Sequence, residues 1–142
     1  DTLRVKMNGK SVRVRAACAD APEVAHNAKE RGNRADRNQY QWGERAKQRL
    51  NQLLVGNQVL LDITDTDQYG RKVAEIRLPN GTFVQQALVA EGLAVAYRRY
   101  YKNCPSSALI DQAEAQAKSK RLGVWGDPAF VMPSVFRQQR RN

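Results

Sequence analysis

Histidine and cysteine are scarce in this 142-residue sequence, which has one histidine, two cysteines and no long apolar run. With His26 as the single histidine, Cys18 and Cys104 are too few to form a zinc site. No segment approaches the roughly 18 apolar residues that a membrane-spanning helix needs. No basic region followed by an apolar stretch opens the chain, so we expect that a signal peptide has been removed and that residues once preceded Asp1.

The two cysteines allow two arrangements. Cys18 and Cys104 could form one long-range disulfide, which would place the protein in an oxidising compartment. They could instead be two separate buried thiols, and their spacing alone slightly favours the thiols.

Acidic residues are outnumbered: 24 Lys and Arg face 14 Asp and Glu, for a formal net charge of +10. Such an excess favours a polyanionic partner, either nucleic acid or an anionic membrane surface. The simpler interpretation is a charged, well-solvated surface, and composition does not separate the two.

The first 18 residues have the pattern of a β-hairpin. Apolar and charged residues alternate over 2–7, and Asn8-Gly9 is a strong two-residue turn signal before a returning strand over 10–18. The register that follows pairs Met7 with Lys10, Leu3 with Val14, and Asp1 with Ala16.

The rest of the chain alternates between strand and helix patterns. Residues 24–40 are basic and lack apolar periodicity, which predicts a long loop. Helices are predicted over 41–55, 85–91 and 106–122, and further strands over 59–63, 71–78, 82–84 and 93–97. About five short strands with intervening helices indicate an α+β fold, a small closed or partly open barrel such as an OB-fold, packed on helices. We expect one domain over 1–128 and a basic tail over 129–142 that frays.

One strand that begins with arginines ends on acids. In RVRAACADAPE (13–23), Asp20 and Glu23 flank Pro22, which stiffens a corner that also presents the Ala21 carbonyl. Oxygen ligands of this kind suit a hard cation, and Asp1 could join them if the strand curls sharply after Ala16. Taken alone, DAPE is better explained as a pair of turn or capping acids.

Arginines near the acids favour a binding site over a simple pair of turn or capping acids. Arg15 precedes the acids in the same strand, and Arg71 follows a turn that enters another strand. Guanidinium groups clamp phosphate bidentately, and a cation held by carboxylates neutralises it from another side. The combination predicts a phosphoryl-transfer site.

Several motifs in the same order resemble the staphylococcal nuclease-like (thermonuclease) family. They are DT followed by LRV at 1–5, VRAACADAPE at 14–23, DQYGR at 67–71, LVAEGLAVAY at 88–97, and AEAQAK with LGVW at 113–125. The resemblance covers nearly all of residues 1–126 and implies a five-stranded OB-type barrel packed against three α-helices. It also implies Ca²⁺-dependent hydrolysis of DNA and RNA that leaves 3′-phosphate and 5′-hydroxyl ends.

The resemblance also implies a role for individual residues. Asp1 and Asp20 would supply carboxylates to one Ca²⁺ ion, with Mg²⁺ or Mn²⁺ as substitutes, and Ala21 would supply its main-chain carbonyl. Glu23 would be the general base, and Arg15 and Arg71 would hold the scissile phosphate, with Arg71 also near the leaving group. Tyr69 and Tyr97 match tyrosines that contact the bound nucleotide.

The chain departs from the family pattern at several places. Ala21 replaces a threonine, Gln68 replaces a lysine, and the 24–40 loop is longer. We expect the basic residues of this loop to grip the polymer; they are Lys29, Arg31, Arg34 and Arg37. The cysteines lie outside the family pattern, but a secreted or periplasmic setting favours the Cys18–Cys104 disulfide.

Three functions follow in order of preference. The first is a nuclease acting as a monomer on single-stranded or locally unpaired DNA and RNA. The second is a catalytically weak OB-fold module that binds nucleic acid; the presence of all five residues Asp1, Arg15, Asp20, Glu23 and Arg71 argues against it. The third, binding to anionic lipid, is disfavoured because no strongly amphipathic basic helix is evident.

Overall fold

The computed structural model describes residues 2–141, so the predicted pairing of Asp1 with Ala16 lies outside the described residues. Strands β1 (Thr2–Met7) and β2 (Lys10–Ala16) form an antiparallel hairpin. Asn8 (φ 53°) and Gly9 (φ 78°) make its left-handed turn. The predicted register is confirmed, with Met7 opposite Lys10 and Leu3 opposite Val14.

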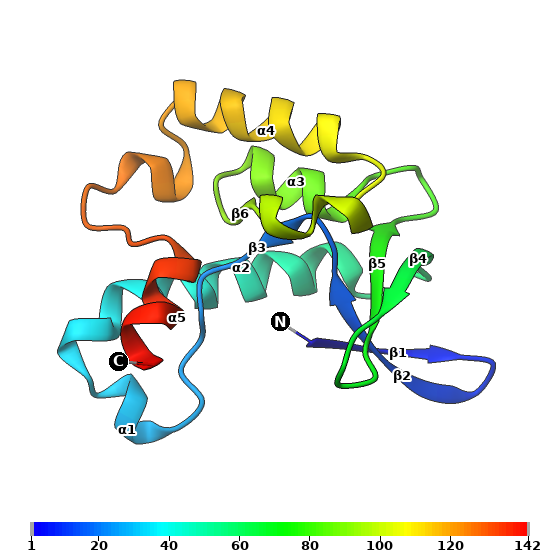
Figure 1. The fold of residues 1–142 in the computed structure, drawn as a ribbon, viewed down its shortest axis with the longest axis horizontal. Coiled ribbons are helices and arrows are strands. Elements are labelled where there is room, and N and C mark those ends of the chain that lie inside the picture. Colours follow the sequence, from blue (N-terminus) through cyan, green and yellow to red (C-terminus); the bar gives the residue numbers. More distant parts are fainter. Residues whose placement is uncertain (1, 142) are drawn as a thin grey trace.

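The hairpin belongs to a mixed sheet with the strand order β1-β2-β5-β4 (Figure 1). Strand β5 (Lys72–Arg77) runs parallel to β2, and β4 (Leu60–Thr66) pairs antiparallel with β5. A second, two-stranded sheet joins β3 (Ala19–Asp20) to β6 (Val95–Ala96). Together with the helices, this confirms the expected α+β fold.

The chain turns sharply between β2 and β3. Such a turn after Ala16 was expected, because without it Asp20 could not approach the start of the hairpin. Cys18 adopts φ 76° at this turn, a left-handed conformation that disfavours a residue with a Cβ atom. The Cys18 carbonyl accepts a hydrogen bond from the Tyr97 N–H (2.8 Å). The strain at Cys18 therefore redirects the chain so that Asp20 leaves the main sheet and pairs beside β6.

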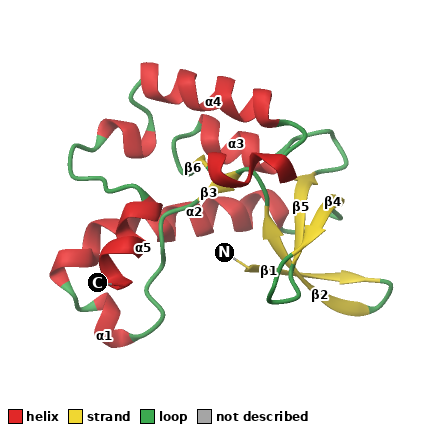
Figure 2. Cartoon of the chain, viewed as in Figure 1, coloured by secondary structure: helices red, strands yellow, loops and turns green. Residues whose placement is uncertain are grey.

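Three helices pack against the strands (Figure 2). They are α2 (Arg37–Leu54), α3 (Val84–Ala90) and α4 (Ser107–Ser119). Two 3₁₀ segments, η2 (Arg98–Asn103) and η3 (Gly123–Gly126), lie on either side of α4 in the chain. The core joins the sheet to α3 and α4 through fully buried side chains that include Val14, Ile76, Val89 and Ile110.

The expected long loop over 24–40 is partly helical, so that prediction was wrong in its extent. Helix α1 (Ala28–Arg31) is capped by Asn27, whose side chain accepts from the Glu30 N–H, and η1 (Arg34–Asp36) is capped in the same way by Asn33. Helix α2 begins at Arg37 rather than at residue 41 because Gln39 and Tyr40 are already buried. Apolar periodicity failed here because these short helices depend on caps and on tertiary burial.

The tail does not fray over its described part. Residues Pro133–Arg141 form helix α5, which lies beside the N-terminal part of α2 (Figure 1). Phe136 is buried and meets the Tyr40 ring edge-on, with ring centroids 5.8 Å apart. Helix α5 is thus a basic, amphipathic helix that sequence reading did not anticipate, and its apolar side is used within the fold.

No helix within residues 2–141 is both long and apolar enough to cross a membrane.

Candidate active site

The corner that carries the acids is held from two sides. Asp20 pairs with Val95 of β6 and is 6% exposed. The Glu23 N–H donates to Oε1 of Gln39 on α2 (3.0 Å), and the backbone of Pro22 and Glu23 lies against Gly43 of the same helix. The corner therefore has a fixed position, with Ala21 half-buried inside it.

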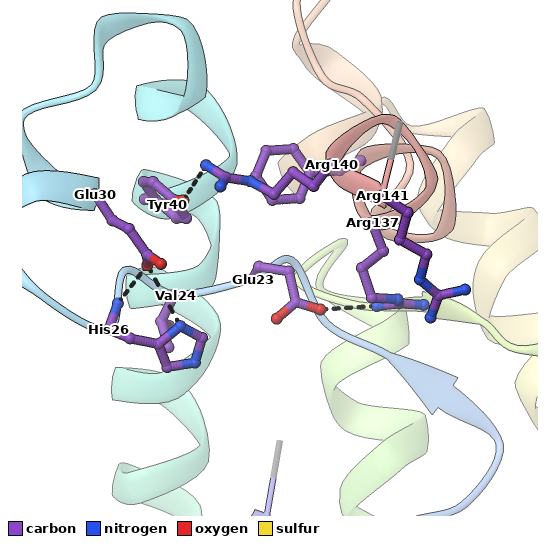
Figure 3. A pocket seen from close by; sticks show the side chains of 9 residues that line it. Glu23, Val24, His26, Glu30, Tyr40, Arg137, Arg140 and Arg141 are labelled. Carbon is purple, nitrogen blue, oxygen red and sulfur yellow. Dashed lines mark hydrogen bonds and ion pairs between the residues drawn. The ribbon is translucent and has the colours of Figure 1, made fainter.

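The two carboxylates face one guanidinium. Arg137 of α5 donates to both carboxylate oxygens of Asp20 (Nη2 to Oδ2 2.6 Å, Nη1 to Oδ1 3.1 Å) and to Oε1 of Glu23 (2.8 Å). Figure 3 shows Glu23 and Arg137 directed toward one another across the hollow between α2 and α5. Hydrogen bonds to Asp20, opposed by burial and supported by Glu23, raise the pKa of Arg137.

Sequence analysis missed Arg137 because it treated residues 129–142 as a fraying tail. A usable signal was present: Pro133 is a favoured first residue of a helix, and the basic residues Arg137, Arg140 and Arg141 recur at helical spacing. That signal predicts a helix. It does not reveal that the helix meets Asp20, which lies 117 residues earlier in the chain.

Arg15 joins this cluster through an aromatic ring. Its guanidinium lies 5.3 Å from the centroid of Tyr97 and 5.6 Å from that of Tyr100. The Arg137 guanidinium lies 5.9 Å from the same Tyr97 ring. Tyr97 is therefore contacted both by the arginine predicted to hold phosphate and by the arginine that pairs with the carboxylates.

Arg71 reaches the same end of the hairpin. It donates through Nη1 to the hydroxyl of Thr2 (3.0 Å), and Thr2 lies opposite Arg15 in the β1–β2 ladder. The Arg71 guanidinium also lies 5.6 Å from the ring of Tyr69, which is largely exposed. The structure thus brings Arg15 and Arg71 to neighbouring positions beside residue 2, while Asp1 is outside the described residues.

Asp67 fixes the Arg71 side chain. Its Oδ2 accepts from Nε of Arg71 (2.7 Å), and its Oδ1 accepts from the backbone N–H groups of Arg71 (2.9 Å) and Tyr69 (3.0 Å). Burial opposes ionisation, but these hydrogen bonds outweigh it and hold the pKa of Asp67 below its usual value. Sequence reading used Asp67 only as part of a motif, and its positioning role comes from the turn geometry.

The basic residues expected to grip a polymer are exposed. Lys29 and Arg31 lie on α1, Arg34 on η1, and Arg37 at the start of α2. Arg31 and Arg37 line a hollow that shares Tyr40 with the hollow containing Glu23 and Arg137. A basic surface therefore adjoins the carboxylate pair.

Cys18 and Cys104 meet in the core, as one of the two alternatives predicted. Their sulfur atoms lie 2.11 Å apart, and both residues are buried. Buried Glu75 is near the sulfurs, but its carboxylate accepts from the Ser106 N–H (2.7 Å) and pairs with Arg77. With its sulfurs paired and its carboxylate satisfied, this Cys-Glu-Cys group is not arranged as a metal site.

Comparison with known proteins matches residues 13–127 to the family described as "Staphylococcal nuclease homologue". The chain is 33% identical over 150 aligned positions to "Micrococcal nuclease" of Shigella flexneri, covering 100% of this chain and 77% of that protein. It is 25% identical to an "Uncharacterized endonuclease" of Escherichia coli O157:H7, over 99% of this chain and 80% of that one. It is 31% identical to "Endonuclease YncB" of Bacillus subtilis (strain 168), over 96% of this chain and 62% of that one.

Proposed function

The chain belongs to the staphylococcal nuclease family, and we propose that it is a Ca²⁺-dependent nuclease that hydrolyses DNA and RNA. The observation that carries the proposal is the pair of carboxylates of buried Asp20 and half-buried Glu23, which holds the Arg137 guanidinium. Arg15 and Arg137 both lie against the ring of Tyr97. A pair of carboxylates directed at one cation is the arrangement that a hard metal ion needs.

The residues present fit a divalent cation. Asp20 and Glu23 offer carboxylate oxygens, Ala21 offers a main-chain carbonyl between them in sequence, and the Arg137 guanidinium is a cationic stand-in at the same oxygens. Asp20 and Ala21, together with Asp1, would hold the ion, Ca²⁺ by preference with Mg²⁺ or Mn²⁺ as substitutes. When bound, such an ion polarises a phosphoryl oxygen and offsets the charge that develops on it.

Glu23 is placed to act as the general base. Its carboxylate would accept a proton from the attacking water, whose oxygen forms a new bond to phosphorus as the bond to the 5′ oxygen breaks. The departing 5′ oxygen takes a proton from solvent, which leaves 3′-phosphate and 5′-hydroxyl ends. Glu23 can do this only after its ion pair with Arg137 opens.

Arg15 and Arg71 would bind the scissile phosphate. Two guanidiniums offset the charge that builds up on phosphate in the transition state, and they remain protonated throughout. Arg71 is held by Asp67 and Thr2 and would also donate to the departing oxygen. Preorganised donors of this kind lower the barrier because they need no rearrangement during the reaction.

We propose single-stranded or locally unpaired nucleic acid as the preferred substrate. Tyr69 is 63% exposed beside Arg71, so its ring is available to stack on an unpaired base, and Tyr97 adjoins Arg15. Lys29, Arg31, Arg34 and Arg37 would bind the backbone beyond the site. We further propose a monomer that works in a secreted or periplasmic setting, where a Cys18–Cys104 disulfide persists.

The second candidate is a nucleic-acid-binding module with weak catalysis. The ion pairs of Arg137 with Asp20 and Glu23 favour it, because they occupy the oxygens that catalysis needs. The two candidates share the basic surface and differ only in what happens at this pair of carboxylates.

A digestion experiment separates them. Labelled single-stranded DNA and RNA would be incubated with the protein in Ca²⁺, Mg²⁺, Mn²⁺ or chelator, alongside Glu23→Gln, and the ends of the products identified. We expect cleavage with Ca²⁺, loss of cleavage in chelator, and a rate lower by about 10² or more for Glu23→Gln. Full activity in chelator would remove the metal from the mechanism, and an undiminished Glu23→Gln would remove the base; binding without cleavage would support the module.

A further inference from the structure

Helix α5 delivers a guanidinium to the oxygens that the proposed cation requires. We propose that Arg137 competes with the divalent cation for Asp20 and occupies the proposed base Glu23, so that α5 is an autoinhibitory plug that must leave before the site can work. This inference rests on the proposed cation site and adds its regulation by the chain's own C-terminal helix.

The competition follows from the contacts. Arg137 uses both oxygens of Asp20 and one of Glu23, and these atoms are 2.6–3.1 Å from its nitrogens. A cation at the same oxygens would lie within a few ångströms of the guanidinium, where two positive charges repel strongly in a partly buried site. Asp20 is nearly inaccessible, so it has little freedom to turn toward a second partner.

The plug is held by contacts at one end of α2. Phe136 packs on Tyr40, Arg140 pairs with Asp36 and Tyr40, and the Gln39 amide donates to the Val131 carbonyl (3.0 Å). Figure 3 shows Arg140 reaching toward Tyr40 on the far side of the hollow from the Glu23–Arg137 pair. Phe136 and Tyr40 lie outside the main hydrophobic cluster, so release of the 9-residue helix α5 does not require that core to open.

Gln39 connects the plug to the corner. Its side chain accepts from the Glu23 N–H and donates to the Val131 carbonyl just before α5. The same residue therefore orients the corner and the segment that leads into the plug. Gln39 thus fixes α5 and the two acids relative to one another, which places Arg137 beside both carboxylates although it lies far from them in the sequence.

Calorimetric titration of the full chain with Ca²⁺ alone tests the competition. Arg137→Ala should lower the Kd for Ca²⁺ by about 10-fold or more, because charge-assisted hydrogen bonds no longer oppose the ion. Phe136→Ala should also lower the Kd, because it loosens α5 without changing any charge. Arg141→Ala is the matched control: it removes the same charge from the same helix at an exposed position that has no ion pair among the described residues, and its Kd should stay within about twofold of the parent.

Amide hydrogen exchange provides a readout that does not depend on catalysis. Saturating Ca²⁺ should speed exchange in α5 of the parent protein while exchange in the buried part of α2 stays unchanged. The reason is that Ca²⁺ binds the state in which α5 is released and so lowers the population of the state in which α5 is docked. In Arg137→Ala, α5 should exchange quickly with or without Ca²⁺.

The outcomes separate this inference from the proposed function. Equal Ca²⁺ affinities for the parent, Arg137→Ala and Phe136→Ala, with α5 equally protected in Ca²⁺, would overturn the plug and leave the metal-dependent nuclease intact. No Ca²⁺ binding by any of the three would overturn both. Tighter binding by Arg137→Ala and Arg141→Ala alike would overturn the plug in favour of a general charge effect.

Discussion

Gly43 of α2 lies directly against Glu23: a Cβ atom at position 43 would sit 2.2 Å from the Glu23 carbonyl oxygen and 2.8 Å from that of Pro22. The helix approaches the corner this closely only because position 43 has no side chain. The placement of the proposed base therefore depends on a residue that takes no part in the chemistry.

Gly43→Ala should push the corner away from α2. We expect it to destabilise the fold by about 1–3 kcal/mol, as overpacking does, and to lower the cleavage rate by on the order of 10²-fold because Glu23 is displaced. Urea unfolding and rate measurements under native conditions would separate the two effects. Gly32→Ala is the control, since its Cβ would be 3.5 Å from the nearest backbone atom, and it should leave both quantities nearly unchanged.

Arg15 and Arg71 should matter for the reaction much more than for folding. Each is expected to lower kcat by on the order of 10² or more when replaced by alanine, since a preorganised donor to the transition state is lost. Arg4→Ala removes an exposed charge from β1 and should have little effect on kcat. Thermal unfolding midpoints should remain similar for Arg15→Ala and Arg4→Ala and fall slightly for Arg71→Ala, which loses its ion pair with Asp67. A loss of activity that only parallels the loss of stability would contradict a role at the phosphate.

Local features of the fold were predictable from sequence. The Asn8-Gly9 turn fixes the hairpin register through backbone geometry alone, and Pro22 confines the chain between Asp20 and Glu23 to a corner. The motif positions also brought Arg15 and Arg71 to one end of the sheet, where Thr2 links them.

Features that depend on distant partners were not predictable. The early start of α2 relies on burial of Tyr40 against Phe136, about a hundred residues along the chain. The contact of Arg137 with Asp20 is of the same kind. No periodicity within a segment encodes such contacts, because a basic amphipathic helix carries the same pattern whether it docks or stays in solvent. Helix α1 is different, because its Asn27 cap is a local signal that a search for apolar periodicity passes over.

Asp67 should give the protein an acid-sensitive contribution to stability. Its pKa in the folded state lies below the ordinary 3.8. Between the folded-state and unfolded-state pKa values, the unfolded protein therefore binds more protons than the folded protein. The contribution is complete above about pH 4 and is lost as pH falls through the folded-state value. Asp67→Asn should lower the free energy of unfolding at neutral pH, and the gap to the parent should narrow below about pH 4 in urea titrations. A gap that is independent of pH would show that Asp67 acts only through neutral hydrogen bonds.

The basic surface should control the salt dependence of binding. Replacing Lys29, Arg31, Arg34 and Arg37 with glutamine should reduce the slope of log Kobs against log salt by up to about 3 for a single strand, or roughly 0.7 for each lost phosphate contact. The measurement uses the Glu23→Gln background so that the strand stays intact, while kcat is measured separately and should barely change. Lys6→Gln with Lys10→Gln, at the exposed hairpin end, is the comparison. An unchanged slope in the fourfold variant would mean that the polymer is bound elsewhere.

The pairing of Cys18 with Cys104 should be a covalent link between the turn that joins β2 to β3 and the segment before α4. The two residues are 86 positions apart, so the bond would close a long loop in the unfolded chain. The chain-entropy estimate for such a loop is about 4–5 kcal/mol, although strain at Cys18 reduces it. We expect the Cys18→Ser, Cys104→Ser variant to unfold at a lower urea concentration, and a reductant to lower the parent to a similar value while leaving the variant unaffected. Thiol titration of the unfolded parent should find no free thiol; two free thiols would contradict the bond and, with it, the oxidising setting that we propose.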